Sequence, residues 1–295
     1  MKIVVGIPAF NEEKNIGKII AKVNKIADKV IVCNDNSTDA TKEIAEQMGA
    51  IVVNHERNLG YGGAIKTIFL KAREIDADIL VTMDGDGQHR IEDLKKIIDP
   101  ILEEKSDIVI GSRFLEKDQK NIPKYRKIGI KAITKLANVS LENPITDSQS
   151  GFRSYSKQSI QQINPSENGM GISNEILMKA SKLKMKIIEV PIEILYEGNT
   201  STHNPISHGA SVTLSTLKFI SIEHPLKFYG IPGIIFLSIG IIFMILTLQM
   251  FTETRQILLS TAIISVGAIV IGTMLLMSSI ILYSIVNIVK EQSSK

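Results

Sequence analysis

The chain has 295 residues, a formal net charge of +3 and one cysteine, Cys33. The small net charge gives no indication of a nucleic-acid partner, and a single cysteine excludes a disulfide within the chain. The length predicts one or two domains. We expect no signal peptide, because Asn11, Glu12 and Glu13 interrupt the N-terminal apolar stretch after ten residues.

Short apolar strands alternate with amphipathic helices along the first part of the chain. We expect strands at Lys2–Ile7, Lys29–Cys33, Ala50–Asn54, Ile79–Met83 and Asp107–Gly111, and helices at 14–27, 40–48, 60–74 and 91–104. The short connections predict a mostly parallel sheet with right-handed crossovers, and therefore an α/β domain. Farther along, Ile187–Leu195 contains Pro191, which favours an edge strand.

Polar residues follow three of the expected strands. The clusters are Asn11-Glu12, Asn34-Asp35 and Asp84-Gly85-Asp86-Gly87-Gln88. Parallel strands end at one edge of their sheet, where ligands of open α/β sheets bind. Two carboxylates one residue apart favour a divalent cation with oxygen ligands, such as Mg²⁺ or Mn²⁺. The Asp-Gly segment alone is equally consistent with a simple turn, but three clusters at one edge favour a nucleotide site.

The glycine-rich segment Gly60–Ala64 has neither the Gly-Lys-Ser/Thr ending of a P-loop nor the spacing of a dinucleotide fingerprint. Its small residues predict a helix N-terminus that approaches a ligand closely. The polar segment Gly198–Gly209 contains two histidines without metal-ligand spacing, which favours a surface loop.

Cations follow in the next part of the chain. Arg113 comes after the strand that ends at Gly111, and the Thr146–Arg153 segment adds Asp147 and a second arginine. The segment Asn121–Asn138 is basic and interleaved with apolar residues. This pattern is consistent with a helix at a membrane surface or with an ordinary solvated helix face.

Two long stretches near the C-terminus contain no charged residue. One lies between Lys227 and Glu253, and the other lies between Arg255 and Lys290. Each can supply the roughly 20 apolar residues that span a bilayer, so we expect transmembrane helices near Tyr229–Leu248 and Leu259–Ile285. A buried hairpin of a soluble protein is the alternative. The lysines at both ends place those ends in the cytoplasm by the positive-inside rule. We therefore expect a cytoplasmic domain at 1–210, an amphipathic juxtamembrane segment at 211–228, two spans within 229–285 and a cytoplasmic tail at 286–295.

Five motifs, IPAFNEE, NDNSTDAT, MDGDGQ, GSRF and DSQSGFR, occur in that order. They resemble the motifs of family-2 glycosyltransferases with a GT-A fold, and more narrowly those of the dolichyl-phosphate mannose and glucose synthase branch. The resemblance covers about Lys2–Glu197. It implies a metal-dependent enzyme that uses Mg²⁺ or Mn²⁺. The expected reaction moves a hexose or N-acetylhexosamine from a nucleoside-diphosphate sugar to a polyprenyl (dolichyl) phosphate in the lipid bilayer.

The resemblance also implies roles for individual residues. It assigns the metal to Asp84, Asp86 and Gln88; the nucleotide-sugar pocket to Pro8, Asn11, Glu12, Asp35 and Asp84; the acceptor phosphate to Arg113, Arg126 and Arg153; and the reaction centre to Asp147, Arg113 and Arg153. Two departures stand out, since Asn34 occupies a position that is usually acidic and the Gly198–Gly209 loop does not follow the mannose-synthase pattern. The second favours a UDP-sugar over a GDP-sugar. The sugar, the polyprenyl lipid, the oligomeric state and direct contact of Gln88 with the metal stay open.

Several other interpretations compete with this one. A processive polysaccharide synthase usually carries a Gln-x-x-Arg-Trp motif, and this chain has no tryptophan. A nucleotidyltransferase needs a glycine-rich, basic N-terminal loop, which MKIVVGIPAFNEE is not. A family-2 enzyme with another membrane or glycan acceptor, and a non-catalytic membrane partner that keeps the fold, remain alternatives. For transfer to a lipid phosphate we expect a single displacement with inversion at the anomeric carbon.

Overall fold

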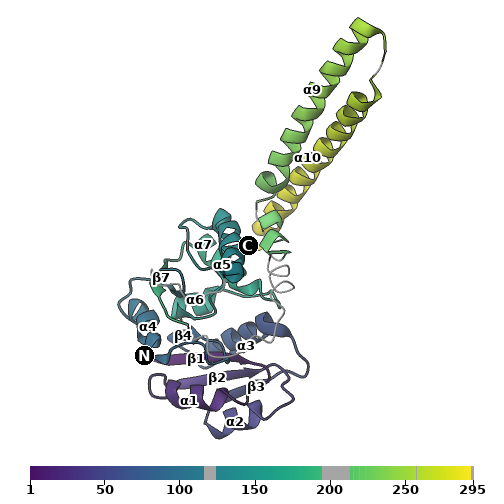
Figure 1. Cartoon of the computed structure of the whole chain (residues 1–295). Helices are drawn as coiled ribbons and strands as arrows, with labels where there is room; N and C mark the ends of the chain where they lie inside the picture. Colours follow the sequence, from purple (N-terminus) through teal and green to yellow (C-terminus); the bar gives the residue numbers. More distant parts are fainter. Residues whose placement is uncertain are drawn as a thin grey trace. The chain divides into compact units, whose positions relative to one another are not determined.

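The computed structural model describes residues 1–115, 124–194, 213–214, 216–218, 220–222, 224–256 and 258–293 (Figure 1). The chain divides into two compact units, Met1–Thr216 and Leu217–Lys295. The predicted surface loop at 198–209 lies outside the described residues, as do residues 211, 212, 215, 219 and 223 of the predicted amphipathic segment at 211–228. The four-part division at 210, 228 and 285 stays a prediction.

The first unit contains a seven-stranded sheet in the order β3-β2-β1-β4-β6-β5-β7. Every pairing is parallel except the two that β6 makes with β4 and β5. The mostly parallel sheet predicted from the sequence is therefore confirmed, and Pro191 does end an edge strand. The strands are β1 (Ile3–Ala9), β2 (Lys29–Asn34), β3 (Ile51–Asn54), β4 (Ile79–Thr82), β5 (Ile108–Ser112), β6 (Arg153–Ser156) and β7 (Ile187–Pro191).

Helices cover both faces of this sheet, as the alternation of buried side chains along β1 requires. Val5 packs in one core with α1 and α4, whereas its neighbour Val4 packs in the other core with α3 and α7. The helices are α1 (Ile16–Val23), α2 (Thr41–Gln47), α3 (Gly60–Glu74), α4 (Leu94–Leu102), α5 (Lys124–Ala137), α6 (Lys157–Gln162) and α7 (Ile172–Lys182), with short 3₁₀ turns at Ile91–Asp93 and Asn138–Ser140.

The reversed strand β6 brings a late part of the chain to the carboxyl edge of the sheet. Because β6 runs against β4, its first residue, Arg153, pairs with Thr82, the last residue of β4. On its other side the Gly111 amide donates to the Phe152 carbonyl at 2.9 Å. Residues that precede β6 therefore lie beside residues that follow β4 and β5.

The second unit is a hairpin of two long helices, α9 (Ile231–Thr254) and α10 (Leu259–Ser293), preceded by a π-helical turn at Leu226–Gly230. Glycines allow the helices to approach closely: a Cβ on Gly240 would lie 2.8 Å from the Ile269 amide. The Ser265 hydroxyl donates to the Gly240 carbonyl at 2.9 Å. Small residues and interhelical hydrogen bonds are typical of helix pairs in membranes.

Both helices are long and apolar enough to cross a bilayer, as predicted. The spans are Leu226–Thr254 and Leu259–Ile288, and only 11% of the most apolar 18-residue stretch of each is buried. A core hairpin of a soluble protein would bury most of these side chains, so the exposed apolar surface favours lipid contact.

Candidate active site

The three polar clusters predicted from the sequence meet at the carboxyl edge of the sheet, because β1 pairs with both β2 and β4. Asn11, after β1, accepts from the Thr38 amide at 2.8 Å and joins the loop after β2. A Cβ on Gly85, after β4, would lie 3.2 Å from the Pro8 carbonyl and 3.4 Å from Glu12 Cγ. The loop after β4 therefore packs directly on the loop after β1.

Acidic side chains are crowded at the end of β4. Burial, and then the charge of Asp84, raises the pKa of Asp86. Burial also raises the pKa of Glu12, with the neighbouring carboxylates Asp86, Asp39 and Asp84 adding to the effect. Burial opposes ionisation of Asp84 too, but the His89 ring, the Tyr61 hydroxyl and the charge of Arg113 together hold its pKa below the usual value. Asp84 is thus the carboxylate that stays ionised most readily.

Asp84 has one oxygen that hydrogen bonds do not satisfy. Its Oδ2 lies 3.3 Å from His89 Nε2, whereas its Oδ1 is buried and makes no hydrogen bond with any of the described residues. An unpaired buried carboxylate oxygen is unfavourable unless a cation or donor approaches it. This oxygen, with Asp86 two residues away, fits a divalent metal ion.

The described residues contain no group of three or more His, Cys, Asp or Glu side chains arranged to hold a metal ion. Mg²⁺ does not need such a group, because it is commonly held by one or two carboxylates together with substrate phosphates and water. The oxygen donors of Asp84 and Asp86 match this chemistry. The main-chain N–H of Gln88 donates to Asp86 Oδ1 at 3.0 Å. The role of the Gln88 side chain as a metal ligand stays a prediction.

Asp35, at the end of β2, has a different environment. Its Oδ1 accepts from His55 Nδ1 at 2.7 Å and from the Leu59 amide at 2.8 Å, and its Oδ2 accepts from the Gly60 amide at 2.8 Å. The residue is 4% exposed. Asp35 therefore fastens the end of β2 to the start of α3. One lone pair of the carboxylate stays available to a ligand, and the place of Asp35 in the nucleotide-sugar pocket stays a prediction.

Arg113 and Asp147 form a bidentate ion pair. Arg113 Nε lies 2.6 Å from Asp147 Oδ2, and its second nitrogen, Nη2, lies 2.7 Å from Oδ1. Asp147 is fully buried, and its amide donates to Glu189 on β7 at 2.9 Å. Two parallel bonds fix the plane of a guanidinium as well as its position. Asp147 thus orients Arg113, and its place at the reaction centre stays a prediction.

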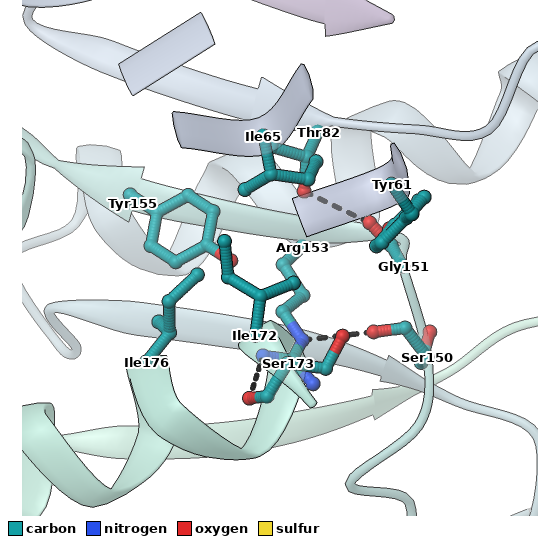
Figure 2. A pocket seen from close by; sticks show the side chains of 10 residues that line it. All are labelled: Tyr61, Ile65, Thr82, Ser150, Gly151, Arg153, Tyr155, Ile172, Ser173 and Ile176. Atoms are coloured by element: carbon teal, nitrogen blue, oxygen red, sulfur yellow. Dashed lines mark hydrogen bonds between the residues drawn. The ribbon is translucent and has the colours of Figure 1, made fainter. Parts of the chain in front are cut away.

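Arg153 lies in the interior and bonds main-chain carbonyls (Figure 2). Its Nε donates to Ser150 O at 2.8 Å, and its two terminal nitrogens donate to Ser173 O at 2.8 Å and to Ser148 O at 2.7 Å. It is 1% exposed, and the adjoining cavity, at about 10 Å³, has room for about one water molecule. This geometry argues against the predicted contact with an acceptor phosphate. The side chain of Arg126, the third predicted phosphate ligand, lies outside the described residues.

The glycines at the start of α3 have a different purpose from the one predicted. A Cβ on Gly62 would lie 2.4 Å from the Glu167 carbonyl, and the Gly63 amide donates to the Asn168 carbonyl at 3.2 Å. The main chain of the loop before α7 occupies the space that the sequence suggested for a ligand. These small residues are required for packing between a helix and a loop.

Sequence reasoning missed four side chains that shape the site: His55, Tyr61, His89 and Glu189. His89 follows the acidic motif directly and stacks on Phe152 with ring centroids 4.8 Å apart, so its position beside the motif was a usable signal. The other three lie far along the chain from the carboxylates or amides they contact, and no spacing rule connects them.

The mostly parallel sheet, with its reversed strand β6 and an acidic cluster at its carboxyl edge, has the arrangement of a glycosyltransferase with a GT-A fold. The chain belongs to glycosyltransferase family 2: the sequence profile described as "Glycosyl transferase family 2" matches residues 4–163. The family, the fold and the glycosyltransferase class predicted from the sequence are confirmed.

Two similar curated proteins are named for lipid-phosphate acceptors. One is the UDP-N-acetylglucosamine–dolichyl-phosphate N-acetylglucosaminyltransferase of Methanococcus voltae, which is 35% identical over 64% of this chain and 84% of its own length. The other is a dolichyl-phosphate hexose transferase of Haloferax volcanii, 31% identical over 77% of this chain and 96% of its own.

Among solved structures, the chain resembles glucosyl-3-phosphoglycerate synthase from Mycobacterium tuberculosis in complex with Mn²⁺, UDP and glucosyl-3-phosphoglycerate. The TM-score is 0.57 at 21% identity, over 75% of this chain and 79% of that one. At this identity the likeness shows a shared fold, and it adds nothing about the acceptor.

Proposed function

We propose that this protein transfers a sugar from a nucleoside-diphosphate donor to a polyprenyl phosphate at the membrane surface. The observation that carries the proposal is the buried, unsatisfied Asp84 oxygen, which lies within an acidic cluster at the carboxyl edge of the sheet. The names of similar curated proteins support a dolichyl-phosphate acceptor. Two helices long enough to span a bilayer support an acceptor that resides there.

Asp84 and Asp86 would hold a divalent cation against the donor diphosphate, with Mg²⁺ or Mn²⁺ as the candidates. When bound, such an ion supplies charge stabilisation for the departing nucleoside diphosphate. Asn11, Pro8 and Glu12 lie at the same edge and would line the donor pocket. Burial raises the pKa of Glu12, so this carboxyl ionises less readily than a free glutamate.

The acceptor chemistry requires a cation more than a base. A phosphate monoester has a second pKa of about 6, so the acceptor oxygen is already largely ionised near neutral pH. Arg113, held in a fixed plane by Asp147, would bind the phosphate and offset its repulsion from the donor diphosphate. The ionised oxygen would then attack the anomeric carbon once, with inversion, as the bond from that carbon to the diphosphate oxygen breaks and the nucleoside diphosphate leaves.

The hairpin supports a membrane location for this reaction. A polyprenyl chain keeps its phosphate at the bilayer surface, and an anchored domain meets that phosphate and an aqueous donor together. We propose that the catalytic unit faces the cytoplasm, on the basis of the lysine distribution. Whether the hairpin also shapes the acceptor site is tested by removing it.

The test is a donor panel with the purified full chain, Mn²⁺ or Mg²⁺, and a polyprenyl phosphate, with radiolabel followed into the lipid fraction. Incorporation from one nucleotide-sugar, lost on addition of a chelator, is the expected result. Label that enters no lipid from any UDP- or GDP-sugar would contradict the proposal. A product with the anomeric configuration of the donor would contradict inversion.

A second experiment uses a chain truncated before Leu226 and a short, water-soluble polyprenyl phosphate. Unchanged turnover, relative to the full chain, would show that the hairpin only anchors the domain. A large loss of turnover with unchanged donor affinity would show that the hairpin contributes to acceptor binding.

A further inference from the structure

The buried Arg153 hydrogen-bonds the segment Asp147–Gly151, here named the 147–151 segment, which connects two parts of the site. We propose that Arg153 is a positioning residue, which holds the 147–151 segment so that one end orients Arg113 and the other sets the Asp84 carboxylate. This inference rests on the proposed function, because it assigns Asp84 to the donor metal and Arg113 to the acceptor.

Arg153 fixes the 147–151 segment through hydrogen bonds to its main chain. Two of its three hydrogen bonds end on carbonyls of the segment, those of Ser148 and Ser150, and the third ends on Ser173 of α7. Figure 2 shows the guanidinium between Ser150 and Ser173. A buried guanidinium that bonds three main-chain carbonyls fixes the spacing between the loop and the helix, because its five donors lie in one rigid plane.

One end of the segment reaches the acceptor side. Asp147 is fully buried and accepts two hydrogen bonds, of 2.6 and 2.7 Å, from the Arg113 guanidinium. Glu189 accepts from the Asp147 amide at 2.9 Å and from the Thr146 amide at 2.8 Å. The position of the Arg113 guanidinium therefore follows the position of this end of the segment.

The other end of the segment reaches the donor side. A Cβ on Gly151 would lie 2.7 Å from Asp84 Oδ1, 3.0 Å from Asp84 Oδ2 and 2.6 Å from the Tyr61 hydroxyl. Thr82, at the end of β4, donates to the Gly151 carbonyl at 2.8 Å (Figure 2). Gly151 thus forms the wall against which the Asp84 side chain rests, and any larger residue there must displace that carboxylate.

The 147–151 segment therefore joins both halves of the site through five residues. If a substitution removes the hydrogen bonds of Arg153, the carbonyls of Ser148 and Ser150 lose their donor. Asp147 and Gly151, at the two ends of the segment, then shift with them. Both cation binding at Asp84 and acceptor binding at Arg113 should weaken together. A residue that contacts only the acceptor phosphate would change only the second of these, and this difference makes the inference testable.

The experiment measures two quantities on the full chain in detergent. One is the affinity for Mn²⁺ in the presence of UDP, measured by calorimetry and by the electron paramagnetic resonance of free Mn²⁺. The other is the KM for the polyprenyl phosphate. For Arg153→Lys we expect the Mn²⁺ affinity to fall about tenfold or more, the typical effect of residues that orient metal ligands, and the acceptor KM to rise. An unchanged Mn²⁺ affinity with a raised acceptor KM would overturn the proposal and make Arg153 an acceptor ligand.

A matched control is Arg73→Lys, because the Arg73 guanidinium also donates to main-chain carbonyls, those of Ile160 and Ile163 at the end of α6. We expect both measured quantities to keep their wild-type values in this variant. Loss of Mn²⁺ affinity in Arg73→Lys equal to that in Arg153→Lys would attribute the effect to general destabilisation and would overturn the inference.

Gly151→Ala tests the donor end without removing a buried charge, and so answers the question even if Arg153→Lys does not fold. Its expected result is a Mn²⁺ affinity at least about tenfold lower, while Gly129→Ala, where a Cβ meets nothing within 4 Å, leaves the affinity unchanged. Wild-type Mn²⁺ affinity in Gly151→Ala would overturn the inference. If the wild-type chain binds Mn²⁺ and UDP but labels no lipid, the proposed acceptor is wrong while the positioning role still stands.

Discussion

Two aspartates at the same edge of the sheet have opposite environments. Asp35, after β2, accepts three hydrogen bonds from one side chain and two amides. Asp84, after β4, keeps a buried oxygen with no hydrogen bond from the described residues and stands beside two carboxylates of raised pKa. The fold supplies hydrogen-bond donors to both oxygens of Asp35. It leaves one oxygen of Asp84 without a donor.

This contrast separates residues that build the edge from residues that use it. In sequence the two look alike, since each is an acid that follows a short apolar strand. The difference comes from the donors that the tertiary structure brings near each one. Substitution of a carboxylate whose oxygens all accept hydrogen bonds within the fold should therefore lower stability. Substitution of a carboxylate that lacks such donors should instead weaken ligand binding.

The largest expected effect is in the acidic cluster that follows β4. Asp86→Ala should lower sugar transfer by about 10³-fold, because metal charge stabilisation contributes several kcal/mol to such reactions. In the absence of metal its Tm in detergent should not fall, since one of three crowded carboxylates is removed. Retained transfer would remove the metal assignment, and a lower metal-free Tm would contradict the contrast with Asp35.

At Asp35, whose oxygens accept three hydrogen bonds, the substitution Asp35→Asn should reduce stability. The amide cannot accept all three hydrogen bonds that the carboxylate accepts, and bonds to a charged group contribute about 1.5–3 kcal/mol each. We expect a loss of about 3 kcal/mol, or roughly 6–12 °C in the Tm of the first unit. An unchanged Tm with an increase only in donor KM would show that Asp35 belongs to the donor site instead.

His55→Gln should have a smaller effect of the same kind. The ring joins Asp35 to the Thr67 hydroxyl through contacts of 2.7 and 2.8 Å. Loss of the shorter contact should lower stability by about 1.5 kcal/mol, measured by thermal unfolding in detergent. A double-mutant cycle with Asp35→Asn should show coupling, and additive effects would contradict the network.

Glu175 offers a pH-dependent test outside the acidic cluster. Burial acts to raise its pKa, but bonds from Lys179, Ser166 and Glu167 outweigh burial and lower the pKa below its ordinary value. A lowered native pKa gives stability that is present above the unfolded value of about 4.5 and is lost as pH falls through the native value. Glu175→Gln should therefore lower Tm by a few degrees at pH 7, and the difference should shrink toward pH 3. A difference that grows on acidification would contradict this sign.

The smallest expected effect is at Cys33, which lies 3.5 Å from His55 Nε2. Burial, followed by the charge of Asp35, raises the pKa of its thiol to about 12, so almost no thiolate exists at pH 8. Native protein should resist alkylation at that pH and react only when unfolded. Rapid labelling of the native chain would show that the end of β2 opens more readily than its hydrogen bonds suggest.

Much of the proposed donor half, which consists of the loops after β1, β2 and β4, was predictable from sequence. Apolar runs gave the parallel strands, helical spacing gave α3 within its observed bounds of Gly60 and Glu74, and the polar clusters do meet at one edge. These features depend on local periodicity, which a single sequence displays.

The proposed acceptor half, which consists of Arg113 and the residues from Asp147 to Arg153, was less predictable for a physical reason. β6 has only four residues, Arg153–Ser156, with no apolar run, and it becomes a strand because β4 and β5 flank it. A buried arginine is rare, so Arg153 looked like a phosphate ligand until its three carbonyl partners were known. Main-chain acceptors leave no mark in a sequence, and the same is true of the carbonyls packed on Gly62.

The reversed strand β6 has a consequence for how such enzymes diversify. β5 and β6 are paired neighbours, so the stretch from 113 to 152 leaves the sheet and returns to it at adjacent points of one edge. Closing a longer loop costs little additional entropy, about 0.6 kcal/mol for each doubling of length. If Arg113 binds the acceptor as proposed, an insertion in this stretch would change the acceptor site while β1, β2 and β4, and the donor site proposed at their ends, keep their positions.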